Sequence, residues 1–122
     1  MTTANSAKNG TKEELTFKAI HEQAPTKPGV VFWIGPVGET FFWRDLLRVS
    51  YDPSPGDDEP DERITMLFRL SDIVIQGHGL RDVYLHCQTC RLDWIKISSQ
   101  STIMIGNPPL VIGIHIKKPK KD

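Results

Sequence analysis

Short runs of β-branched and aromatic residues, set apart by glycine and proline, most constrain what this chain can fold into. The clearest runs are VVFWI at 30–34, RITMLFRL at 63–70, DIVIQG at 72–77 and LVIGIHI at 110–116. Such runs are typical of β-strands, and Gly35-Pro36 and the GHG at 77–79 read as breaks after two of them. Large apolar side chains alternate at Ile64, Met66 and Phe68, which indicates one buried face. The sequence therefore predicts a mostly antiparallel sheet.

Three further segments are expected to be strands, and one connection is expected to be a loop. We expect strands at 91–97 and 101–106, and one at 39–51 with a bulge near Asp45; a helical turn over 43–47 is the alternative for this last segment. The segment 52–62 combines three prolines, a glycine and six acidic residues. Such a composition cannot bury apolar surface, so we expect a long, extended hairpin connection.

Two segments carry helical patterns. Thr11 and Glu14 form a capping-box pattern at the start of a short helix over 11–21, which the prolines of APTKPG would end. From Leu80 the apolar residues recur at offsets of 3, 4, 7 and 10, and this spacing predicts a helix over 80–91 after a weak cap at Gly79. A hairpin over 80–91 stays open as the alternative, because a strand reading also places several apolar residues on one face.

The expected fold class is α+β, with about 5–7 strands in a mostly antiparallel sheet and one or two helices packed on one face. Only the strand-helix-strand segment 72–97 is a candidate for a parallel crossover. The single domain is expected to span 11–116. Residues 1–10 are expected to be a disordered lead, and residues 117–122, KKPKKD, a disordered basic tail.

The composition limits the class of protein and the cellular location that we expect. The 122 residues carry a formal net charge of zero, with 39% hydrophobic and 25% charged residues, as in ordinary globular domains. This balance argues against nucleic-acid or membrane binding through the overall field. The apolar runs are too short to span a bilayer, and no secretory signal pattern is present. Two cysteines without such a signal predict free thiols in the cytoplasm.

The stretch LHCQTCRLDW holds both cysteines, Cys87 and Cys90, three residues apart. A C-x-x-C can be half of a zinc site, with His86, His115 or His78 completing it, but the second half of the usual pattern is missing. A redox pair would need a thiolate in the first turn of a helix. The prediction is therefore that both thiols pack as small hydrophobic side chains on the helix stripe, with zinc or thiol redox chemistry as alternatives.

His78 is the best single candidate for a functional imidazole, because it stands between two glycines. Glycine gives the backbone the freedom to approach a ligand closely, so a small-ligand pocket near His78 is a second alternative. The GHGL segment precedes the predicted helix, whose first amides can face an anion. It lacks the lysine and third glycine of phosphate-binding motifs, so an ordinary turn is the main interpretation.

The aromatic residues suggest a contact surface. Five of them fall within twelve residues, on both sides of a GPVG turn: Phe32, Trp33, Phe41, Phe42 and Trp43. Neighbours of opposite parity cannot all face one core, so two or three of them should lie on the outer face, unless helices cover it. The main prediction is a small non-catalytic binding domain that contacts a protein partner, or a second copy as a homodimer, through the hairpin 30–43, with Phe32, Trp33, Phe42 and Trp43 as its binding residues. His78 is the binding residue of the alternative small-ligand pocket. No cofactor is expected.

Overall fold

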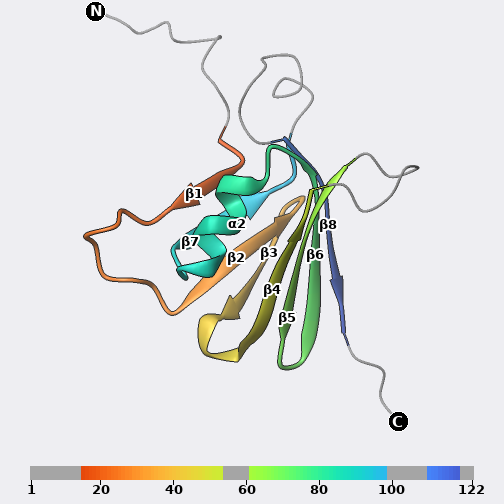
Figure 1. Cartoon of the computed structure of the whole chain (residues 1–122). Helices are drawn as coiled ribbons and strands as arrows, with labels where there is room; N and C mark the ends of the chain where they lie inside the picture. The colour runs from red at the N-terminus through yellow and green to blue at the C-terminus, as the bar shows by residue number, and fades with distance from the viewer. Residues whose placement is uncertain (1–14, 54–60, 99–109, 119–122) are drawn as a thin grey trace, which may run out of the picture.

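The structure is a computed structural model, and it describes residues 15–53, 61–98 and 110–118. These residues are mostly sheet, with eight strands and one α-helix (Figure 1). The strands are β1 (Phe17–Ala19), β2 (Gly29–Ile34), β3 (Val37–Phe42), β4 (Leu46–Asp52), β5 (Glu62–Phe68), β6 (Ser71–His78), β7 (Leu92–Lys96) and β8 (Leu110–Lys117). The predicted strand at 101–106 and lead at 1–10 lie outside the described residues, as does most of the tail; Lys117 itself ends β8.

The strands form two sheets of four, not the single sheet that the sequence predicts. The order is β1-β7-β2-β3 in the first sheet and β4-β5-β6-β8 in the second. The second sheet is antiparallel throughout, and its β5–β6 pairing runs without interruption from Glu62↔Gly77 to Phe68↔Ser71. In the first sheet, β2 and β7 are parallel. The predicted crossover over 72–97 is wrong, since β6 and β7 belong to different sheets and β7 pairs with β2 instead.

A 3-10 helix, η1 (Trp43–Asp45), carries the chain from the first sheet into the second. The prediction of one strand over 39–51 is therefore wrong, and the alternative of a helical turn is confirmed. The turn is held at its far side, where the Arg69 N–H donates to the Asp45 carbonyl at 2.8 Å. Because η1 changes the direction of the chain, β3 and β4 belong to different sheets. One continuous strand over 39–51 would have kept them in the same sheet.

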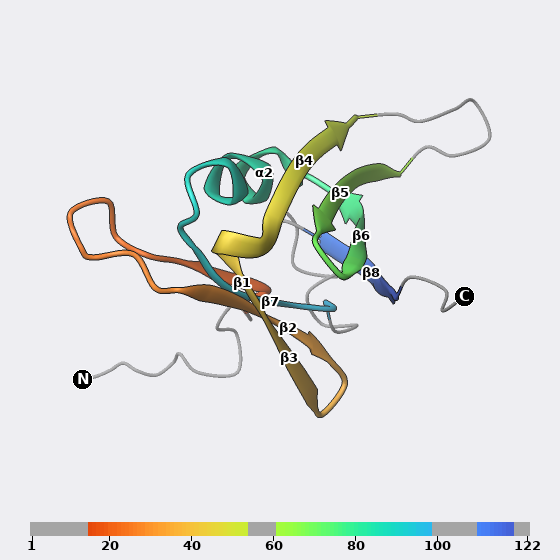
Figure 2. The ribbon, with the colours of Figure 1, turned by 90° about the horizontal axis from the view of Figure 1, so that it is seen from below.

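The helix α2 (Arg81–Gln88) confirms the prediction over 80–91, although it is shorter and its N-cap is Leu80. Val83 and Cys87, four residues apart, are its buried face. Figure 2 shows α2 on the open side between the two sheets, beside β4. The predicted helix over 11–21 is wrong in its described part, because Phe17–Ala19 forms β1 and pairs with β7. Backbone pairing with a distant strand outweighs the weak helical pattern there.

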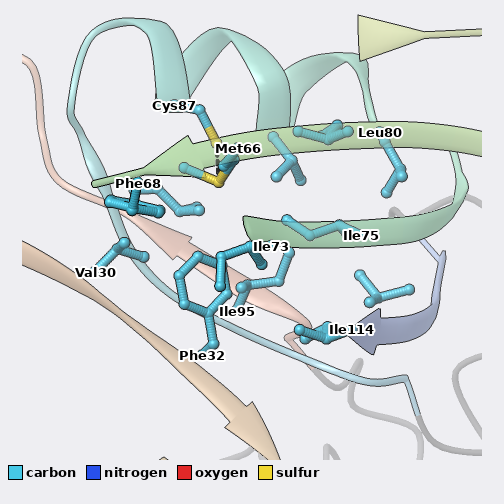
Figure 3. Packing of buried hydrophobic residues seen from close by; sticks show 14 residues of the cluster. Val30, Phe32, Met66, Phe68, Ile73, Ile75, Leu80, Cys87, Ile95 and Ile114 are labelled. Carbon is cyan, nitrogen blue, oxygen red and sulfur yellow. Dashed lines mark hydrogen bonds between the residues drawn. The ribbon is translucent and has the colours of Figure 1, made fainter. Parts of the chain in front are cut away.

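The core lies between the two sheets and α2 (Figure 3). It draws Val30, Phe32, Leu92 and Ile95 from the first sheet and Leu80, Val83 and Cys87 from the α2 segment. The second sheet supplies the rest: Ile64, Met66, Phe68, Ile73, Ile75, Val111 and Ile114. These alternating side chains are the periodicity that predicts strands in this half of the sequence. No helix in the described part of the chain is long and apolar enough to cross a membrane.

Candidate functional site

The amides at the start of α2 do face an anion, and that anion is a side chain of the same chain. Glu62, at the start of β5, accepts hydrogen bonds from the N–H groups of Gly79 and Leu80, each at 2.8 Å. The Tyr51 hydroxyl donates to the same carboxylate at 2.8 Å. Glu62 on β5 therefore caps the helix. Its carboxylate occupies the amides before α2 that the sequence suggested could face an anion.

This capping also sets the pKa of Glu62. Burial opposes ionisation of the carboxyl, but the hydrogen bonds from Leu80, Gly79 and Tyr51 outweigh it, and the pKa of Glu62 lies below its ordinary value. Burial and the neighbouring Glu62 carboxylate raise the pKa of Tyr51. The ring of Tyr51 in turn stacks on Tyr84 of α2, with 5.3 Å between centroids. Glu62, Tyr51 and Tyr84 thus join β5, β4 and α2. The Glu62 carboxylate accepts from the Tyr51 hydroxyl and from the two amides, and the Tyr84 hydroxyl accepts from Gln88.

His78 lies at the end of β6 and is about half exposed. Its Nε2 is 3.2 Å from Oδ1 of Asp61, and both residues are at the surface. A hollow of about 450 Å³ is bordered by Phe42, Trp43, Arg44, Cys90 and the 26–28 segment, and His78 is not among its lining residues. The small-ligand pocket near His78 stays a prediction.

The two cysteines are in different environments, so the prediction of one shared buried stripe is right for Cys87 alone. Cys87 is fully buried, with its Sγ 3.9 Å from Sδ of Met66 (Figure 3). Burial, with a smaller effect of Cys90, raises its pKa to about 12. Cys90 lies beyond the helix at φ +58°, where the chain turns back, and is half-buried. Burial raises the pKa of Cys90 as well.

The turn at Cys90 has the hydrogen bonds of a Schellman motif. The N–H of Arg91 donates to the His86 carbonyl at 2.8 Å, and the N–H of Cys90 to the Cys87 carbonyl at 3.2 Å. This motif places its left-handed residue just after the helix, which is why the helical stripe does not reach the second thiol. The same turn directs Arg91 toward the β1–β2 connection, where its guanidinium donates to the carbonyls of His21 and Ala24.

The residues proposed for zinc are held apart. The His86 ring contacts Phe17, and His115 lies on β8, with its Nε2 3.2 Å from Oε1 of Gln76. Across residues 15–53, 61–98 and 110–118, no three His, Cys, Asp or Glu side chains gather as metal ligands would. A thiol buried in the core beside Met66 is also a poor ligand, because the metal-binding form is the thiolate.

The aromatic residues divide between the core and the surface. Phe32 is fully buried and contacts Phe41 edge-to-face, so its assignment to the contact surface is wrong. Trp43 is half-buried and packs against the core. Trp33 and Phe42 are 39% and 44% exposed. Parity explains the division, because Phe32 points inward and its neighbour Trp33 must then point outward.

The outward side chains of β2, β3 and β7 form one surface. Val31 pairs with Trp94 across β2 and β7, and Trp33 lies across β3 at Gly38, where an added Cβ would come within 2.8 Å of the ring. Phe42 lies opposite Gly29 on the same outer face. We call Val31, Trp33, Phe42 and Trp94 the aromatic surface. Trp94 was not among the binding residues predicted from the sequence. The alternation of apolar and charged residues over 92–97 was the pattern that could have indicated its position on the outer face.

Comparison of the chain with protein-family models, curated proteins and solved structures finds no match. The fold and the site together define a small, mostly β domain with an exposed aromatic sheet face.

Proposed function

We propose that this chain is an α+β interaction domain of the cytoplasm that binds protein through the aromatic surface and performs no catalysis. The observation that carries the proposal is the exposure of Trp33 and Phe42 on one sheet face. Their sequence neighbours Phe32 and Phe41 lie on the opposite face and pack into the core. Contiguous exposed aromatic side chains mark binding sites, because they are otherwise a solubility liability. Tryptophan is also enriched among the residues that contribute most binding energy.

The edges of the aromatic surface have the polar character that protein interfaces show. Lys18 lies opposite Trp94 across β1 and β7 and is exposed, and Lys96 lies opposite Trp33 across β7 and β2. Thr40 extends the same face on β3. An apolar centre with a polar rim is the usual anatomy of a protein interface, and the cations are too few for a nucleic-acid footprint.

The geometry supports the two alternative functions less. A zinc or thiol redox site would draw on Cys87, whose Sγ is buried and whose pKa is about 12. A ligand site at His78 would draw on the helix amides, which Glu62 already occupies.

Site-specific photo-crosslinking tests the proposal. A photoreactive phenylalanine derivative is placed at Trp33, at Phe42 or at Leu85, each in the full chain. Leu85 is the matched control, because it is 43% exposed but lies on the outer face of α2. We expect a discrete covalent adduct, with one partner protein or a second copy, from positions 33 and 42 only. No adduct from either position, or an equal adduct from 85, would contradict the proposal.

Alanine variants provide the second measurement. Trp33→Ala and Phe42→Ala remove exposed side chains, so both should fold and both should lose the crosslinked complex when the photoreactive group is at the other position. Trp43 is unsuitable for this purpose, because it packs against the core and its loss would perturb the fold itself. Far-UV circular dichroism verifies folding of each variant.

A further inference from the structure

Four strands stand at sheet edges in the part of the chain that the structure describes, and three of them are blocked. β1 has only three residues. β4 is interrupted between Leu46 and Arg48 and lies against α2, and β8 has a register shift opposite Gln76-Gly77 and ends in lysine. Short length, bulges and lysines are the usual means by which proteins prevent edge pairing. β3 has six residues in unbroken register with β2 and contains neither proline nor lysine.

The phase of the β2–β3 hairpin determines which backbone groups β3 presents outward. A two-residue turn at Gly35-Pro36 makes Ile34↔Val37 the closing hydrogen-bonded pair, and hydrogen-bonded pairs then alternate along the ladder. The Trp43 N–H, which donates to the Pro28 carbonyl at 2.9 Å, agrees with this phase. The backbone groups of Gly38, Thr40 and Phe42 consequently point away from β2, toward the open edge.

We propose that the protein forms a homodimer in which β3 pairs antiparallel with β3 of a second copy, about a two-fold axis at Thr40. This inference rests on the proposed function and names its partner. The pairing joins two four-stranded sheets into one. It forms about four new backbone hydrogen bonds, two between the Thr40 residues and two from Phe42 N–H to Gly38 carbonyl. The Phe42 carbonyl already serves the first turn of η1 as its N-cap.

Charge and shape select this register. With the axis at Glu39, the two Glu39 carboxylates would stand directly opposite each other, which is unfavourable. With the axis at Thr40, Phe42 of each copy lies opposite Gly38 of the other, beside the Trp33 ring that covers that glycine. The two aromatic surfaces become continuous across the axis. A second copy fits because Phe42 and the glycine that it would face, Gly38, are on the same strand.

Space is available on the core side of this edge as well. A hollow of about 170 Å³ is lined by Thr40, Phe41 and Phe42 together with residues of the β5–β6 turn. Leu70 of that turn is 71% exposed. An added strand would cover both the hollow and this leucine.

Disulfide trapping tests the axis directly. In an antiparallel hydrogen-bonded pair the Cα atoms are about 5.5 Å apart, within the range that a disulfide spans. Thr40→Cys, in a Cys90→Ser background, should form a covalent dimer under mild oxidation. Glu39→Cys in the same background is the matched control, since residues 39 of the two copies are diagonal and should not bridge. A Glu39→Cys dimer without a Thr40→Cys dimer would overturn the proposed register.

Sedimentation of the full chain tests the dimer without cysteines. We expect a concentration-dependent dimer, and Thr40→Pro should raise its dissociation constant at least about tenfold by removing an outward N–H. Circular dichroism confirms that the variant folds. A wild-type chain that stays monomeric into the millimolar range overturns the inference, while a photo-crosslink from position 33 to another protein would leave the proposed function standing. A dimer that is lost in Trp33→Ala but intact in Thr40→Pro would overturn the pairing of β3 edges and would leave the proposed function of the aromatic surface standing.

Discussion

Glu62 is the side chain whose replacement tests the architecture most directly. Its carboxylate joins the start of β5 to the start of α2 through Gly79 and Leu80, and to β4 through Tyr51. Glu62→Gln keeps the shape but removes the charge and one of two acceptor oxygens. At least one of the three donors, each 2.8 Å away, then loses its partner.

The expected loss of stability is about 2 kcal/mol at neutral pH. A hydrogen bond to a charged group contributes about 1.5–3 kcal/mol, compared with about 1 kcal/mol for a neutral pair. The interaction of a negative charge with the helix N-terminus adds about 0.3–1 kcal/mol. Because Glu62 is partly accessible to solvent, the lower ends of these ranges apply. Tyr51→Phe removes one donor alone and should cost about 1 kcal/mol.

Urea denaturation followed by circular dichroism measures both variants. The pKa of Glu62 is lowered in the folded state, so its contribution is fully present above the unfolded value near 4.5 and is lost as pH falls through the folded value. The difference in unfolding free energy between wild type and Glu62→Gln should therefore shrink in acid. If the variant is as stable as wild type at neutral pH, or the difference grows in acid, the capping role is wrong.

Three further outcomes follow from the backbone and the thiols. Cys90→Gly should stabilise the fold by about 1 kcal/mol in thermal unfolding, because φ +58° favours glycine; no gain over wild type would refute this. Gly77→Ala should lower the free energy of unfolding measured in urea by about 2 kcal/mol or more, since its Cβ would meet the Leu110 carbonyl oxygen at 1.8 Å. Gly113→Ala, whose Cβ would meet only the movable end of the His115 ring at 3.0 Å, should cost far less. In a thiol titration Cys90 should react in the native state, and Cys87 only after unfolding.

The sequence is most informative where a periodic pattern is long. The strands β2, β5, β6, β7 and β8 and the helix α2 all appear at their predicted places, because alternation or helical spacing reports which face is buried. The candidate site was predicted in part. Trp33 and Phe42 follow from parity, but parity alone does not say which of two neighbouring aromatics points inward, so Phe32 was assigned to the surface.

The remaining differences arise at positions where distant residues decide the local structure. Residues 17–19 become a strand because β7 lies beside them, and Cys90 leaves the helical stripe because a Schellman turn ends α2. The Gly79 amide donates to the carboxylate of Glu62 on β5, which is 17 residues away in the sequence. No local sequence motif predicts this pairing.

By itself, the order of residues determined the mostly β character, the position of the helix and the buried face of most strands. Each of these features depends on the spacing of apolar residues within a short stretch of the sequence. Only the tertiary structure decided that the strands divide into two sheets, that β7 runs parallel to β2 and that no other described strand pairs with the outer edge of β3. Strand pairing is a contact between segments far apart in sequence, and many partners satisfy the same alternating pattern. The packing of the whole core selects among them.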